Sequence, residues 1–296
     1  MAIYHCSIKI ISRGKGKSAV AAAAYRSGER LVNEYDGAIH DYTRKGGIVH
    51  TEILLPDNAP PAFSDRSALW NAVERIEKAK NAQLAREIEI ALPHELTREQ
   101  GISLVREYVK EQFVNAGMCA DVCLHDKNDG NPHAHILLTM RPIEQDGAWG
   151  AKQKKEYVLD RDGNKIYDPK KRQYKCKSIP ATDWNEQTKA EEWRAAWAEI
   201  CNSYLEKGNH TERIDHRSYE RQGIDLIPTV HLGVAAFQME KRGIRTERGN
   251  INRKIEVTNQ KLRQLKARIS KLQSWLKEEA ANTEPPTLAE VIQGIL

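Results

Sequence analysis

Residues 133–140 read HAHILLTM, and this stretch decides the fold that the chain can adopt. Successive side chains of a β-strand point to opposite faces, so His133 and His135 share one face. The other face is apolar and comprises Ala134, Ile136, Leu138 and Met140. We therefore predict a strand that holds two imidazoles on rigid backbone above a buried apolar layer.

A third imidazole precedes this strand by one short loop. His125 follows the predicted strand 118–124, and the loop 126–132 consists mostly of turn-forming residues that fold the chain back. We predict that His125, His133 and His135 bind one divalent metal ion and leave positions open for substrate. Manganese or magnesium is the expected ion, with zinc, nickel or cobalt as alternatives. Scattered surface histidines are the competing interpretation.

The composition sets limits on the class of protein. The 296 residues suffice for one large domain with an appendage, and 40% of them are hydrophobic. No 18-residue apolar segment or signal-peptide pattern is present, so we expect a cytoplasmic protein without membrane insertion. Five cysteines without a CxxC pair argue against a disulfide framework. The net charge of +5 fits a polyanionic partner but is too small to identify one.

Strand and helix patterns occupy the region before the histidines. They predict strands over 2–11, 87–92 and 118–124, and helices over 19–26, 65–80 and 97–115. Ser18 and Thr97 are the expected N-caps of two of these helices. A basic, glycine-broken loop precedes the alanine-rich helix. In the strand 87–92, Glu87 and Glu89 share the polar face.

The character of the chain changes after residue 141. Residues 144–178 are rich in lysine and glycine-punctuated polar turns, too irregular for a core element, and we call them the basic flap. A helix is predicted over 183–207. Apolar residues spaced alternately by four and three between Ile251 and Leu276 predict a coiled-coil seam, within the chain or between chains.

These patterns predict three segments. Residues 1–235 form the main domain with its basic flap. Residues 236–281 form a helical, coiled-coil-like extension. Residues 282–296 contain Pro285-Pro286 and are expected to be a linker and a short terminal helix.

The predicted metal site, the basic flap and the basic loop at a helix N-terminus together indicate phosphate chemistry, because cations and backbone N–H groups favour anions. A nucleophile for such chemistry is Tyr25, since a phenol can attack phosphorus and hold the product as an ester. A tyrosine on an alanine-rich helix is otherwise a packing residue. The residue pattern alone leaves both roles open.

Two separated motifs of this chain resemble those of the MobA/MobL (MOBQ-type) relaxases of mobilisable plasmids. The first is SRGKGKSAV followed by AAAAYRSG at residues 12–28, and the second is His125-Asp126 followed by Asn131-Pro132-His133-Ala134-His135. The resemblance extends through AREIEIALP at 85–93 and DHRSY at 215–219, so it covers about residues 2–235. Members of this family often continue into further C-terminal regions, which favours a chain that is part of a longer protein.

The resemblance implies an HUH endonuclease of α+β class, with a central antiparallel sheet flanked by helices. The three histidines would bind the metal, and Tyr25 would nick single-stranded DNA at a plasmid origin of transfer. The products would be a 5′-phosphotyrosine and a free 3′-OH, which the same site can religate. The implied partners are the nick site and its hairpin, accessory mobilisation proteins and a type IV coupling protein. The implied location is the bacterial cytoplasm on DNA, from which the protein can travel with the transferred strand.

Roles for further residues follow from this chemistry. Glu87 is the candidate base for Tyr25 or the group that orients a metal-bound histidine. Candidates for outer support of the metal site are Glu89, Asp126 and His5. The expected DNA contacts are Arg13, Lys15, Lys17, Arg26, Lys154, Lys155 and Arg217. Aromatic residues among the cations of the flap are expected to stack on bases.

Three other functions are compatible with the same residues. A metal-dependent nuclease would use activated water, with Tyr25 as packing. A non-catalytic DNA-binding protein would use the coiled coil for dimerisation. A rolling-circle replication initiator would also form a phosphotyrosine, but such initiators usually place the tyrosine after the histidines. Only the tyrosine mechanism leaves protein covalently attached to DNA.

Overall fold

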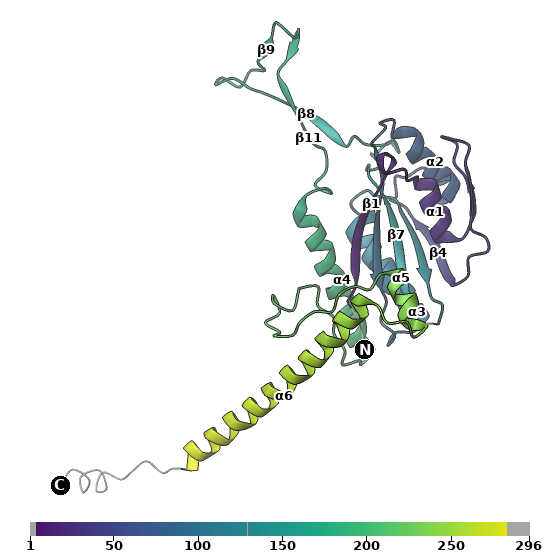
Figure 1. Cartoon of the computed structure of the whole chain (residues 1–296). Helices are drawn as coiled ribbons and strands as arrows, with labels where there is room; N and C mark the ends of the chain where they lie inside the picture. Colours follow the sequence, from purple (N-terminus) through teal and green to yellow (C-terminus); the bar gives the residue numbers. More distant parts are fainter. Residues whose placement is uncertain (1–3, 129, 283–296) are drawn as a thin grey trace, which may run out of the picture. The chain divides into compact units, whose positions relative to one another are not determined.

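A computed structural model describes residues 4–128 and 130–282 of the chain (Figure 1). It divides into two compact units, Met1–His216 and Arg217–Leu296. The first unit contains the sheet and the predicted metal site. The second unit contains the long C-terminal helix.

A five-stranded sheet forms the centre of the first unit. Its order is β1 (Cys6–Ser12), β5 (Gln83–Ala91), β7 (His133–Thr139), β6 (Ala120–His125) and β4 (Ile48–Leu54). Every neighbouring pair is antiparallel. The predicted α+β class and central antiparallel sheet are therefore confirmed, and the strand with the two histidines, β7, lies in the middle of that sheet.

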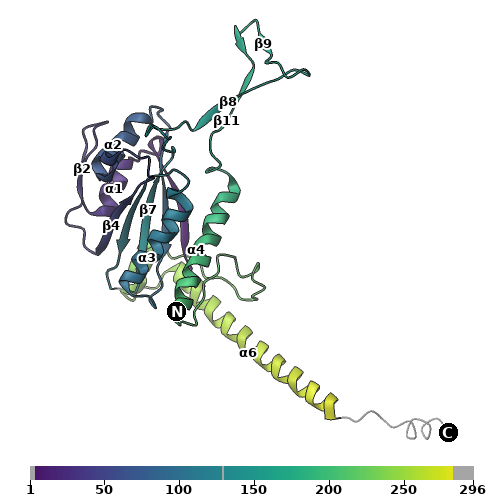
Figure 2. The same cartoon turned by 180° about the vertical axis from the view of Figure 1, so that it is seen from behind.

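Helices cover both faces of this sheet (Figures 1 and 2). On one face lie α3 (Arg98–Val109), continued by a π-helical turn η3 (Lys110–Val114), and α4 (Gln187–Lys207). Their buried aromatic residues pack with the apolar side of β7 and comprise Tyr108, Phe113, Trp193 and Trp197. On the other face lie α1 (Ala19–Ser27) and α2 (Arg66–Ile76), with a second apolar cluster beneath them.

The ends of α1 are fixed by its sequence. The Ser18 side chain accepts a hydrogen bond from the Ala21 N–H, as predicted for an N-cap. Gly28 ends the helix with φ of 72°, and a Cβ at this residue would lie 2.4 Å from Ile48. The alanine side chains of α1 are small, so its backbone packs close to the sheet. This close approach brings the end of α1 to the histidines.

A buried polar network joins α2 to β6 beneath α1. Arg66 donates two hydrogen bonds of 2.8 Å to Asp121, and the Trp70 indole N–H donates a third of 2.9 Å. Glu29 contacts the same guanidinium. Asp121 and Arg66 are both buried, so each charge depends on the other for compensation.

The remaining elements of the first unit lie at its surface. They are the 3₁₀ turns η1 (Arg13–Lys15) and η2 (Pro61–Ser64), the hairpin of β2 (Arg30–Val32) and β3 (Ile39–Asp41), and the strands of the basic flap. The flap is more regular than predicted. It pairs β8 (Gln153–Tyr157) with β11 (Cys176–Pro180), and β9 (Tyr167–Asp168) with β10 (Gln173–Tyr174). These strands are almost wholly exposed, so backbone pairing rather than a core forms the ribbon.

The second unit contains α5 (Val234–Lys241) and α6 (Glu247–Asn282). Its boundary lies after His216, whereas the patterns placed the boundary after residue 235. The reason is an extended segment bound to α6. Asn252 accepts a hydrogen bond of 2.7 Å from the Val230 N–H and donates one of 2.8 Å to its carbonyl. Asn259 forms the same pair with Ile227, at 2.9 and 2.8 Å.

The predicted helix of the extension is present as α6, and its seam residues Leu265, Ile269, Leu272 and Leu276 are exposed. Their coiled-coil partner stays a prediction. The expected linker and terminal helix fall, after Asn282, outside the described residues. Within the described ranges, no helix combines the length and apolarity needed to cross a membrane.

Candidate metal centre

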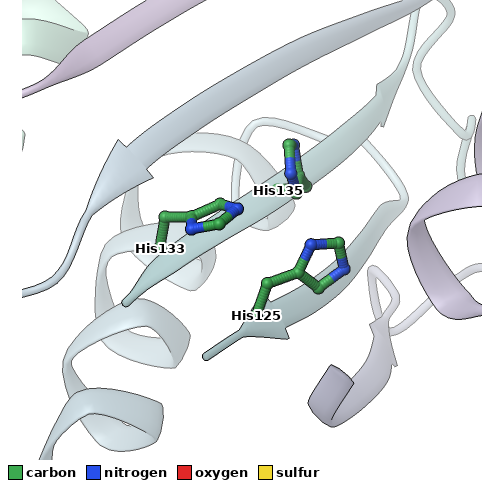
Figure 3. Close-up of side chains that lie close together, drawn as sticks. All are labelled: His125, His133 and His135. Atoms are coloured by element: carbon green, nitrogen blue, oxygen red, sulfur yellow. The ribbon is translucent and has the colours of Figure 1, made fainter. Parts of the chain in front are cut away.

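The sheet register brings the three predicted histidines together. His125 lies opposite His133 in the β6–β7 ladder, and His135 follows two residues later on the same face. Figure 3 shows the three rings converging from these two strands. Ring centroids are 5.3 Å apart for His125 and His133, 4.7 Å for His125 and His135, and 5.1 Å for His133 and His135.

Each imidazole has one ring nitrogen fixed by a neighbouring acceptor. His125 Nε2 donates to the Arg26 carbonyl over 2.7 Å, and His133 Nδ1 donates to the Asn131 carbonyl over 2.7 Å. His135 Nδ1 donates to Glu87 Oε1 over 3.0 Å. These hydrogen bonds set the tautomers, so the donor atoms for a metal are His125 Nδ1, His133 Nε2 and His135 Nε2.

This donor set fits a divalent transition ion. The three histidines offer one ligand atom each, and these atoms lie within 4.8 Å of one another. Burial lowers the pKa of His125 to about 4, with the Lys45 charge and the other two histidines adding to it, against the opposing effect of the Arg26 carbonyl. A neutral imidazole is the form that binds metal, so His125 is ready to do so at neutral pH. Glu87, Glu89 and His135 form a second, overlapping group within the same distance.

Glu87 orients His135 and is itself held by Arg26. The carboxylate is 4% exposed and accepts a hydrogen bond of 2.7 Å from Arg26 Nε. Burial alone would raise the pKa of Glu87, but the His135 hydrogen bond and the Arg26 charge outweigh it and hold the pKa at about 2. A carboxyl group with such a low pKa is a weak proton acceptor. Since the same Glu87 oxygen also accepts hydrogen bonds from His135 and Arg26, the geometry favours an orienting role over that of a general base.

The metal site is joined to the end of α1, where Tyr25 lies. The last carbonyls of a helix lack intrahelical partners. Here the Arg26 carbonyl accepts from His125, and the Tyr25 carbonyl accepts a hydrogen bond of 2.6 Å from Lys45 Nζ. The Tyr25 side chain is 48% exposed, which is unlike a packing residue. A nucleophile candidate thus adjoins a residue that holds a metal ligand.

Comparison with known proteins places these residues in a family. A model described as "MobA/MobL family" matches residues 17–242, a range that contains Tyr25 and all three histidines. The chain belongs to the MobA/MobL family. The resemblance seen in its two motifs is therefore confirmed.

Individual MobA/MobL relatives agree with this placement. The chain is 38% identical over 293 residues to "Probable mobilization protein MobA" of Bifidobacterium longum (strain NCC 2705), covering 94% of this chain and 51% of that protein. It is 38% identical over 267 residues to "Mobilization protein MobL" of Acidithiobacillus ferridurans, covering 82% and 65%. The chain thus spans about half to two thirds of the length of these relatives.

A solved structure shares the fold of this MobA/MobL chain. It is described as "Molecular Basis of Vancomycin Resistance Transfer in Staphylococcus aureus" and is 35% identical in sequence. The TM-score is 0.63, and the alignment covers 74% of this chain and 100% of the other. The sheet and its flanking helices are therefore common to both proteins.

Arg13 and Arg26, two of the predicted DNA contacts of the MobA/MobL chain, form ion pairs within the protein. Arg26 pairs with Glu87, as described above. Arg13 forms an ion pair of 2.7 Å with the buried Glu74 and donates to backbone carbonyls of the α2 end. Both guanidinium groups are largely covered, which favours internal support, and their expected contact with DNA phosphates stays a prediction. Lys15 and Lys17 of the same loop are exposed, as a phosphate contact requires.

The three candidates for outer support of the metal site, Glu89, Asp126 and His5, make different contacts. Glu89 pairs with the exposed Lys9 at 2.9 Å; burial opposes the effect, but the Lys9 ammonium holds the pKa of Glu89 below its usual range. Asp126 accepts a hydrogen bond of 2.8 Å from the Asn128 N–H and so shapes the loop rather than a histidine. His5 is exposed and its carbonyl accepts from the Ala91 N–H at the end of β5.

The flap carries exposed cations and clustered aromatic rings. Lys154 and Lys155 are exposed on β8. The Tyr174 ring lies 5.4 Å from that of Tyr167 and 6.3 Å from that of Tyr157. The predicted contact Arg217 is exposed and belongs to the second unit.

Sequence patterns missed Lys45 and Tyr42, which contact Tyr25. The Tyr42 ring meets the Tyr25 ring edge-on at 5.2 Å, and Lys45 Nζ lies 3.8 Å from the Tyr25 centroid. The one signal available was the basic pair Arg44-Lys45 before two glycines.

The orienting role of Glu87 predicts a difference between two glutamates on one strand face. Glu87→Gln is expected to weaken Mn²⁺ binding by roughly 10- to 100-fold, because His135 loses a charged acceptor. Glu89→Gln is the matched control and is expected to stay within about threefold, since a partly exposed ion pair contributes little. Isothermal titration calorimetry would measure both. An equal loss of Mn²⁺ affinity in both variants would mean that Glu89 is a ligand. Unchanged Mn²⁺ affinity in both variants would contradict the orienting role of Glu87.

Proposed function

We propose that this chain is a relaxase that nicks single-stranded DNA at an origin of transfer through attack by Tyr25. The observation that carries the proposal is the hydrogen bond from His125 to the Arg26 carbonyl, which fixes a metal ligand beside the tyrosine. Family membership and the mobilisation proteins among the relatives support it.

The three imidazoles would hold a divalent ion, which when bound would act as a Lewis acid on the non-bridging oxygens of the scissile phosphate. Other groups of the protein fix the orientation of each imidazole ring. Glu87 fixes the His135 ring, Asn131 fixes His133, and the end of α1 fixes His125. A phosphate bound at this site would lie near the end of α1 that carries Tyr25.

The proposed covalent step exchanges one phosphate ester bond for another. Tyr25 Oη loses its proton to solvent and attacks phosphorus, forming an O–P bond. The bond from phosphorus to the 3′ oxygen breaks, and that oxygen takes a proton and leaves as a free 3′-OH. The 5′ end stays on the protein as a phosphotyrosine. Because the number of ester bonds is unchanged, the reverse step religates the strand without a further energy source.

The exposed cations are suited to hold the DNA backbone. Lys15 and Lys17 lie in the loop before α1, and Lys154 and Lys155 lie on the flap. Such contacts give affinity that falls with salt, whereas the flap tyrosines offer faces for stacking unpaired bases. We extend the proposal to the whole process: binding of the nick site and its hairpin, and mobilisation together with accessory proteins and a type IV coupling protein in the bacterial cytoplasm.

A gel experiment tests this function. The protein is incubated with Mn²⁺ or Mg²⁺ and a panel of labelled single-stranded oligonucleotides carrying origin-of-transfer nick regions, then run under denaturing conditions. A band of DNA attached to protein, with a matching fragment that a polymerase can extend from its 3′-OH, supports a relaxase. Cleavage without attachment would instead identify a nuclease that uses water.

Loss of a ligand should disable the site without unfolding the protein. His133→Ala is expected to abolish detectable Mn²⁺ binding and metal-dependent nicking, because two imidazoles hold the ion far more weakly than three. His133 is only partly buried, so the melting temperature should be nearly unchanged. His94→Ala, which removes a histidine outside the ligand set, is the control. Full nicking by His133→Ala in the presence of EDTA would contradict a metal site here.

A further inference from the structure

Lys45 is held against the ring and the backbone of Tyr25. Its Nζ lies 3.8 Å from the ring centroid, within the range of a cation–π contact, and donates a hydrogen bond of 2.6 Å to the Tyr25 carbonyl. The Tyr42 ring meets the same tyrosine edge-on at 5.2 Å. The Tyr25 ring is therefore contacted by two side chains from one short segment.

That segment is anchored at both ends. The Tyr42 N–H donates to the Glu29 carbonyl over 3.2 Å, and the Asp126 N–H donates to the Gly47 carbonyl over 2.8 Å. Ile48, the first residue of β4, pairs with His125 in the sheet. The position of Lys45 is thus fixed relative to the strand that carries a metal ligand.

Lys45 is positively charged at neutral pH, and no ion pair neutralises this charge in the described residues. Burial lowers the pKa of Lys45 to about 8, with the Arg26 charge adding to the effect, so the ammonium form prevails at neutral pH. In the part of the chain that the structure describes, no ion pair joins Lys45 to a carboxylate. A half-buried cation without a paired carboxylate interacts more strongly with an adjacent ring than a fully solvated, paired cation does.

We propose that Lys45 is a positioning residue for Tyr25 that fixes its ring and stabilises negative charge on it during the reaction. This inference rests on the proposed function. The face of a phenolate is more negative than that of a phenol, so the cation contact strengthens as the O–H proton leaves. The same contact assists religation, in which Tyr25 Oη departs from phosphorus carrying negative charge.

The test separates the rate of the covalent step from DNA binding. Single-turnover attachment is measured at saturating DNA for Lys45→Met, Lys45→Arg and Arg44→Met, together with the dissociation constant of each for the same oligonucleotide. Lys45→Met is expected to slow attachment by roughly 10- to 100-fold, because one preorganised charge is lost at the reacting group. Lys45→Arg keeps the cation and should stay within about fivefold of the unchanged protein. Arg44 is the exposed, equally charged neighbour and should have no effect on this rate.

The outcomes distinguish this inference from the function on which it rests. A lower attachment rate in Lys45→Met that is restored in Lys45→Arg, with similar DNA affinity in both variants, supports the positioning role. An unchanged rate at saturation with weaker DNA binding overturns it and makes Lys45 a phosphate contact. Equal losses in Lys45→Met and Lys45→Arg also overturn it, since packing rather than charge would then matter. Absence of any tyrosine-dependent attachment by the unchanged protein would overturn the proposed function and this inference with it.

Discussion

Replacing Tyr25 by phenylalanine is expected to lower nicking and covalent attachment by at least about 10³-fold, because the attacking oxygen is removed. Phenylalanine keeps the ring, so the contacts with Tyr42 and Lys45 should persist. Affinity for single-stranded DNA should stay within a few-fold, since the proposed phosphate contacts are other residues. The attachment assay on denaturing gels and a fluorescence anisotropy titration would measure the two quantities.

Tyr35→Phe is the matched control for this experiment. Tyr35 is also an exposed tyrosine, but its ring packs against the guanidinium of Arg13, which precedes α1, whereas Tyr25 lies near the end of that helix. This variant should nick at the unchanged rate. Cleavage by Tyr25→Phe at the unchanged rate without attachment would show that water is the nucleophile and that the tyrosine packs.

Removing the Asp121 carboxylate is expected to lower the free energy of unfolding by about 3–5 kcal/mol, because the buried Arg66 charge loses its main partner. The Trp70 indole N–H loses its acceptor in the same variant. Urea unfolding of Asp121→Ala, followed by tryptophan fluorescence, would measure the change. Should Asp121→Ala fail to accumulate as folded protein, Asp121→Asn keeps the shape and should show a smaller loss.

An exposed ion pair of the same chemistry gives the control. Glu34 and Arg75 lie 2.7 Å apart with side chains 60% and 71% exposed, so Glu34→Ala is expected to cost less than about 1 kcal/mol. A similar small loss in Asp121→Ala would show that the network adds nothing beyond a surface pair. Asp121 precedes His125 on β6, so this network also supports the strand that carries this candidate metal ligand.

Local sequence was sufficient for several elements. The N-caps Ser18 and Thr97 were predicted correctly because a cap bonds to an N–H within three residues. The alternation of β7 correctly predicted that Ala134, Ile136 and Leu138 are buried, since strand geometry fixes that period, but Leu137 and Thr139 on the histidine face are buried as well. The pairing of His125 with His133 followed from one short loop between adjacent strands.

Roles that depend on distant partners were not predictable in this way. Arg26 was expected at DNA because its sequence neighbourhood is basic, yet its partner Glu87 lies 61 residues away. Asp121 sits in an otherwise apolar strand and gave no sign of the buried network that it forms with Arg66, 55 residues away. Lys45 contacts Tyr25 only because the segment after β3 returns to the end of α1.

The sequence by itself determined which three histidines meet as the candidate metal ligands, the helix caps, the α+β pattern and, through its motifs, the family. These are properties of short stretches, in which backbone geometry fixes where each side chain points. Only the tertiary structure decided which charged groups support the site from within and which face outward. A charged side chain can be buried only when folding brings to it an oppositely charged or hydrogen-bonding group that compensates for its lost hydration. Which group that is depends on how the whole sheet and its helices pack.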